Sequence, residues 1–135
     1  MRSEKSIRIM IIDGHDEFKR SLKNLLTETI PQSDICFADA DKLRMRTIKA
    51  ADIVLIDGAM WETSGLEIVT RVRQHCPECK NIILTNSHAE VFKEAKSKGD
   101  IVACVDKRQI VENLLPIISK IIKRRGGLKQ KSKQG

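Results

Sequence analysis

The chain has 135 residues, 41% hydrophobic and 32% charged, a composition typical of one globular domain whose core needs no disulfide or metal for stability. No apolar run approaches the roughly 20 residues of a membrane span, and the first residues lack the apolar segment of a secretion signal. We therefore expect a cytoplasmic protein with no membrane contact. The net charge of +7 lies in the C-terminal segment, because residues 1–119 carry as many acidic as basic residues.

Short apolar segments alternate along the chain with segments of helical periodicity. The apolar segments have the length of buried strands: residues 7–12, 34–38, 52–56, 81–85 and 101–105. A segment with apolar residues at helical spacing follows each of them: residues 16–29, 39–51, 64–75, 89–98 and 109–123. Pro116 lies inside the last of these, where a proline removes a hydrogen bond and predicts a kink. The alternation predicts an α/β fold, a three-layer sandwich with a five-stranded parallel sheet and five helices.

A basic segment ends the chain. Every charged residue from Lys120 onward is a lysine or an arginine. We expect residues 1–123 to form the domain and residues 124–135 to form a disordered tail or linker. A solvated tail is the simpler interpretation. Binding of nucleic acid is the alternative, because basic tails bind phosphate backbones without sequence preference.

Polar side chains stand where four of the predicted strands end. Asp13 follows the first strand, Asp57 the third and Lys107 the fifth, while Thr85 closes the fourth. The carboxyl ends of parallel strands meet at one edge, where such folds bind ligands, so we expect these residues to converge. A carboxylate beside a divalent cation can accept a phosphoryl group, with lysine and threonine holding its oxygens. Asp57 is the best acceptor candidate, although polar strand ends are also an ordinary feature of this architecture.

The same residues carry a resemblance to a known family. Asp13, the stretch "VLID" ending on Asp57, "SGLEIV" at 64–69, Thr85 and Lys107 stand in the order found in CheY-like receiver domains of two-component response regulators. The resemblance covers residues 6–123. The stretches "DGH", "CPECKNIILT" and "SH" are most similar to receivers of the NarL/LuxR type, which carry a helix-turn-helix output domain.

The resemblance implies a flavodoxin-like fold and a role in phosphorelay signal transduction. It implies that Asp57 accepts a phosphoryl group from a histidine kinase or a phosphotransfer protein. Mg²⁺ is then held by Asp13, Asp57 and the backbone carbonyl of Ala59, and Thr85 and Lys107 sense the phosphoryl group. The fourth and fifth helices rearrange and pair with a partner or a second copy of the chain. Too few residues follow the last helix for a DNA-binding output domain, so we expect either a stand-alone receiver that acts by protein contact or a fragment of a longer regulator that carries such a domain.

The sequence departs from the family pattern at the metal site. Family members carry two adjacent acids after the first strand, and here the second position is Gly14. Loss of a carboxylate weakens a Mg²⁺ site, so we expect weak binding. Asp16 or Glu17 could replace the missing acid, but both also suit the start of a helix. The fifth strand lacks the family's aromatic residue, and Asn86 follows Thr85 where a small residue is usual. The alternative to a phosphorylated receiver is therefore a degenerate receiver that binds partners without phosphorylation.

Other chemistries find less support in the sequence. Cys76 and Cys79 form a Cys-x-x-Cys pair, but no second pair completes a zinc site, and the pair follows a helix instead of beginning one. The glycine-rich phosphate loops of nucleotide enzymes are missing, and an aspartyl phosphatase would carry a second acid at the position of Ala59. We therefore do not expect an enzyme.

Overall fold

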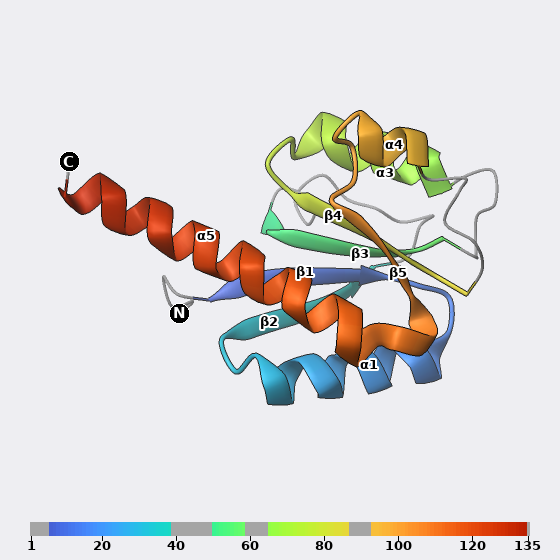
Figure 1. Cartoon of the computed structure of the whole chain (residues 1–135). Coiled ribbons are helices and arrows are strands. Elements are labelled where there is room, and N and C mark those ends of the chain that lie inside the picture. The colour runs from blue at the N-terminus through green and yellow to red at the C-terminus, as the bar shows by residue number, and fades with distance from the viewer. Residues whose placement is uncertain (1–5, 39–49, 59–64, 87–92, 135) are drawn as a thin grey trace.

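The computed structural model describes residues 6–38, 50–58, 65–86 and 93–134 (Figure 1). Five strands form one sheet: β1 (Ile7–Ile12), β2 (Ser33–Ala38), β3 (Ile53–Asp57), β4 (Lys80–Thr85) and β5 (Ala103–Asp106). All neighbouring strands are parallel and follow the order β2-β1-β3-β4-β5. The predicted α/β fold with a five-stranded parallel sheet is confirmed. The order reverses at β1, so that β1 and β3 lie beside each other at the centre.

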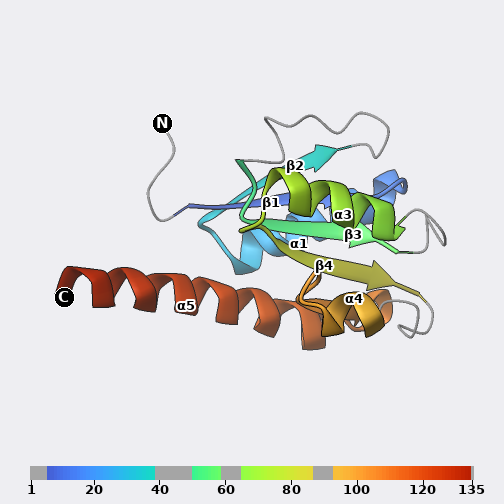
Figure 2. The ribbon, with the colours of Figure 1, turned by 90° about the horizontal axis from the view of Figure 1, so that it is seen from above.

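Helices cover both faces of the sheet. Their bounds are α1 (Asp16–Thr29), α3 (Gly65–His75), α4 (Lys93–Ser97) and α5 (Leu115–Gln134). Figures 1 and 2 show α1 and α5 on one face and α3 and α4 on the other. The predicted helix at 39–51 lies almost wholly outside the described residues. No helix in the described part of the chain combines the length and apolar character that a membrane span requires.

Two apolar cores lie on the two faces of the sheet. Side chains alternate in direction along a strand, so Ile9 and Ile11 of β1 pack toward α1 and α5, whereas Met10 and Ile12 pack toward α3. Leu26 of α1 completes the first core. Because both faces are buried, the central strands are apolar throughout, which explains why they were predicted well from the sequence.

The last helical segment differs from the prediction at both ends. It begins with a 3-10 turn at Lys107–Gln109 and a π-helical turn at Ile110–Leu114 before α5 starts. Pro116 is the second residue of α5, which directly follows the π-helical turn, so the helix type changes beside the proline. The helix runs to Gln134 instead of ending near Lys123. Lysine, glutamine and leucine favour helix and offset Gly126 and Gly127, whereas the expectation of a disordered tail rested on its charge.

Candidate functional site

The carboxyl edge of the sheet brings together the polar residues at the strand ends. Asp13 directly follows β1, and Asp57 is the last residue of β3. Thr85 ends β4 one residue beyond Leu84, the register partner of Asp57. The side chains of Asp13, Asp57 and Thr85 are buried, each residue at most 3% exposed. Three of the four buried polar residues in the described part of the chain lie at this edge, which marks it as the candidate site.

Lys107 joins the two aspartates. Its Nζ lies 3.0 Å from Oδ2 of Asp13 and 3.1 Å from Oδ1 of Asp57. The lysine side chain is only 8% exposed, and its ammonium also lies 4.3 Å from the centre of the Phe18 ring of α1. Buried carboxylates need such a partner, because a buried charge loses its hydration and only an ion pair or hydrogen bonds can compensate for that loss. The expected convergence of Asp13, Asp57 and Lys107 is thus observed.

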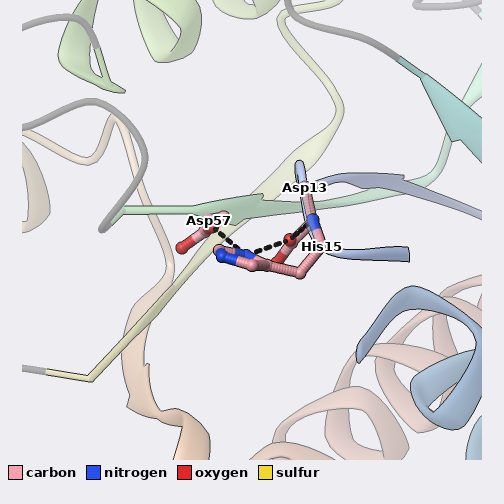
Figure 3. Close-up of side chains that lie close together, drawn as sticks. All are labelled: Asp13, His15 and Asp57. Carbon is pink, nitrogen blue, oxygen red and sulfur yellow. Dashed lines mark hydrogen bonds and ion pairs between the residues drawn. The ribbon is translucent and has the colours of Figure 1, made fainter. Parts of the chain in front are cut away.

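The imidazole of His15 lies between the carboxylates of Asp13 and Asp57 (Figure 3). Its Nδ1 is 3.1 Å from Oδ1 of Asp13 and 3.6 Å from Oδ2 of Asp57. The backbone N–H of His15 also donates a hydrogen bond of 2.7 Å to Oδ1 of Asp13, which closes a short turn after β1. The four carboxylate oxygens are therefore divided between two groups: Lys107 contacts one oxygen of each aspartate, and His15 faces the other.

The sequence analysis did not place His15 in the site. It treated the histidine only as part of the family-like "DGH" stretch. The usable signal was the spacing, because an aspartate often accepts a hydrogen bond from the backbone two residues later. That turn folds residue 15 back over Asp13. The imidazole itself is 66% exposed, so the site opens to solvent on the histidine side.

Neither acid at the start of α1 replaces the one missing at Gly14. Asp16 and Glu17 are exposed in the first turn of the helix, where acids favour the helix dipole. Oδ1 of Asp16 lies 3.3 Å from Nζ of Lys19, on the helix surface. Within the described ranges, the group able to hold a cation consists of Asp13, His15 and Asp57. Ala59, whose carbonyl was expected to bind the metal, lies outside these ranges.

The donor set fits Mg²⁺ only in part. Asp13 and Asp57 supply the carboxylate oxygens that this ion prefers, and bound water can complete its shell. The third group is an imidazole, which suits transition metals better than Mg²⁺. Gly14 adds no charge, and Lys107 already offsets one carboxylate. The residues at the site therefore provide less negative charge than the family pattern.

The turn after β5 holds Lys107 in place. Asp106 accepts a hydrogen bond of 2.8 Å from the backbone N–H of Arg108 and another of 2.6 Å from its Nη2. These bonds from Arg108 lower the pKa of Asp106 to about 2. Asp106 thus caps the 3-10 turn that begins at Lys107.

The cysteine pair lies away from this edge. Cys76 and Cys79 are joined as a disulfide between the end of α3 and the start of β4. Sγ of Cys79 is buried and lies 2.9 Å from the carbonyl oxygen of Ala51, which precedes β3. Because these segments stand at the amino ends of the strands, the disulfide belongs to the opposite edge of the sheet from Asp57.

Comparisons with known proteins identify a family and a fold. A family profile described as "Response regulator receiver domain" matches residues 9–119. A response regulator receiver domain protein of Clostridium thermocellum superposes with a TM-score of 0.73 at 22% identity, over 90% of this chain and 98% of that one. A response regulator of Thermotoga maritima gives 0.69 at 20% identity, over 87% and 98%. A LuxR-family DNA-binding response regulator of Staphylococcus aureus gives 0.67 at 20% identity, over 86% and 98%. A search among curated proteins finds no match.

Proposed function

The chain belongs to the response regulator receiver domain family, and we propose that it acts in two-component signalling by accepting a phosphoryl group on Asp57. The donor is a histidine kinase or a phosphotransfer protein. One observation carries the proposal: Asp57 is buried at the centre of the carboxyl edge, and its Oδ1 lies 3.1 Å from the Lys107 ammonium. A carboxylate in this position has a cation at hand for the charge that accumulates during transfer.

The chemistry is a transfer from nitrogen to oxygen. A carboxylate oxygen of Asp57 attacks the phosphorus of a phosphohistidine, and the P–N bond breaks while the P–O bond forms; the donor imidazole leaves with a proton. Lys107 offsets the negative charge of the phosphoryl oxygens, and the Thr85 hydroxyl donates a hydrogen bond to one of them. Asp13 and Asp57 hold a divalent cation, weakly for Mg²⁺ because of Gly14. When bound, the cation neutralises charge on the phosphoryl group.

The output of the switch is a protein contact. We propose that it uses the surface of α4, β5 and the start of α5, where it meets a partner or a second copy of the chain. Two large apolar side chains are exposed there, Val102 just before β5 and Val111 in the π-helical turn. A DNA-binding output domain is the effector we favour, since one structural neighbour is described as a DNA-binding response regulator. Kinase and receiver meet in the cytoplasm in this proposal, and the chain acts as a signalling domain instead of an enzyme.

The proposal is tested by intact-mass measurement after incubation with acetyl phosphate and a divalent cation. We expect a mass increase of one phosphoryl group in the wild type and none in Asp57→Asn. Asp34→Asn is the matched control, because it removes an exposed carboxylate near the start of β2, at the other edge of the sheet, and keeps the site residues intact. An adduct that persists in Asp57→Asn, or no adduct at any cation concentration, would contradict phosphorylation at Asp57.

A second function follows from how the carboxylates are occupied. Lys107 and His15 already face all four oxygens of Asp13 and Asp57, and Gly14 supplies no further acid. This arrangement favours a receiver held in one state and used as a binding module without phosphorylation. The same mass experiment separates the two functions, since only the first produces an adduct.

A further inference from the structure

His15 gives the site an imidazole nitrogen, a potential metal ligand that the family pattern does not require. The oxygens of Asp13 and Asp57 that Lys107 does not contact both face Nδ1 of the imidazole, at 3.1 and 3.6 Å. These three atoms come from three side chains and lie within 4.8 Å of one another. Metal–ligand bonds of about 2.1 Å at tetrahedral angles place neighbouring ligand atoms about 3.4 Å apart. The two distances from Nδ1 to the carboxylate oxygens are close to this spacing, and each of the three residues offers a ligand atom within 4.8 Å of the others.

We propose that Asp13, His15 and Asp57 bind a divalent transition metal of the zinc and cobalt class, in preference to Mg²⁺. In this site the imidazole of His15 takes the place of the acid missing at Gly14. The inference rests on the proposed function only in sharing its site, because metal binding needs no phosphoryl transfer.

Charge and ligand type both support this preference. With both aspartates ionised, Lys107 leaves one negative charge in excess, which is little for an ion that loses its water as reluctantly as Mg²⁺. Imidazole nitrogen binds divalent transition metals such as Co²⁺ and Zn²⁺ more strongly than it binds Mg²⁺. For these metals the neutral imidazole compensates for the missing carboxylate. Because Lys107 contacts Oδ2 of Asp13 and Oδ1 of Asp57, it can stay in place while the other oxygens bind the metal.

The exposure of His15 leaves the metal accessible. Asp13 and Asp57 are buried, whereas the imidazole is 66% exposed. A metal held by these three ligands keeps its fourth position on the solvent side, as in sites whose metal also binds a small ligand. Water or a phosphoryl oxygen can occupy that position, so that the bound metal would lie beside a phosphoryl group on Asp57.

Equilibrium binding of the metals alone tests the proposal. The full chain is stripped with a chelator, kept in non-reducing buffer so that the Cys76–Cys79 disulfide stays closed, and titrated with Co²⁺ and with Mg²⁺. Calorimetry gives both affinities, and the absorption of bound Co²⁺ identifies its ligands. We expect His15→Ala to weaken Co²⁺ binding about 10- to 100-fold and to leave Mg²⁺ binding within about twofold. Gly14→Asp should instead strengthen Mg²⁺ binding.

His75→Ala is the matched control. His75 ends α3 at the opposite edge of the sheet, beside Cys76, so its loss should change neither affinity. The proposal is overturned if His15→Ala leaves Co²⁺ affinity unchanged, or if it weakens both metals equally. It is also overturned if Co²⁺ shows sulfur charge-transfer bands or is lost in His75→Ala. Since no phosphodonor is present, these outcomes are independent of whether Asp57 is phosphorylated.

Discussion

At the scale of single residues, Lys107 balances two carboxylates that the fold forces together. Asp13 and Asp57 follow adjacent strands in register, so their burial at one edge is a consequence of the sheet. The ammonium contacts an oxygen of each. Removing it leaves two like charges close together in a poorly hydrated place, and such an uncompensated buried charge is strongly destabilising.

We predict that Lys107→Met lowers the free energy of unfolding by about 2 to 4 kcal/mol in metal-free buffer. Asp13→Asn should recover part of this loss when it is added to Lys107→Met, because it removes one of the two repelling charges. Urea denaturation of the two single variants and the double variant measures the coupling. Lys120→Met, which changes an exposed lysine of α5, should stay within about 0.5 kcal/mol of the wild type. Strict additivity of the two site substitutions would contradict the electrostatic explanation.

At the residue scale, the prediction from sequence missed one residue of the site, His15. Asp13, Asp57, Thr85 and Lys107 could be placed at one edge because strand ends follow from apolar runs. His15 could not, since its position depends on a backbone hydrogen bond to Asp13 that turns the chain back after β1. Apolar periodicity contains no information about such a turn.

At the scale of elements, α5 is held to the sheet by a short part of its length. Leu114, just before it, and Ile118 are fully buried, while Ile121 and Ile122 are partly buried against the same core. Lys123 and Arg124 are exposed. Among the described side chains, the apolar stripe ends at Ile122, next to the predicted end of the domain, while the helical backbone continues to Gln134.

We predict that a chain ending at Lys123 keeps the stability of the full chain within about 0.5 kcal/mol, because Ile122 is the last core residue among the side chains that the structure describes. Ile118→Ala should cost about 2 to 5 kcal/mol, since it deletes fully buried methyl groups. Chemical denaturation monitored by circular dichroism compares the variants. A truncated chain as unstable as Ile118→Ala would mean that the helix beyond Lys123 packs on the domain, and would contradict the predicted boundary.

Element positions were predictable to different degrees for a physical reason. The central strands β1, β3 and β4 are buried on both faces, so their apolar runs mark them clearly. The edge strand β5 starts at Ala103, two residues later than predicted, because Val102 is apolar but exposed. The π-helical turn before α5 has no signal in apolar periodicity, since it changes the spacing only once.

At the scale of the whole molecule, the two cores share one set of strands. Ile9 and Ile11 of β1 belong to the core under α1 and α5, while Met10 and Ile12 belong to the core under α3. Neither core can lose its strands without exposing the other. The described parts of the domain should therefore unfold as one cooperative unit, including the edge that holds Asp57.

We predict that Leu26→Ala in one core and Val72→Ala in the other each lower the unfolding midpoint in urea. Each should act on the whole molecule, with the same dependence on urea as the wild type, because the surface exposed on unfolding is unchanged. Hydrogen exchange of the β4 amides, measured with both variants, checks the coupling, since β4 contributes Ile82 to one core and Ile83 to the other. In both variants we expect the β4 amides to exchange faster. The free energy of their protection should fall by the same amount as the global free energy of unfolding. Protection of β4 that survives one substitution would show that the faces unfold separately, and a binding event at the Asp57 edge could then stabilise one layer without the other.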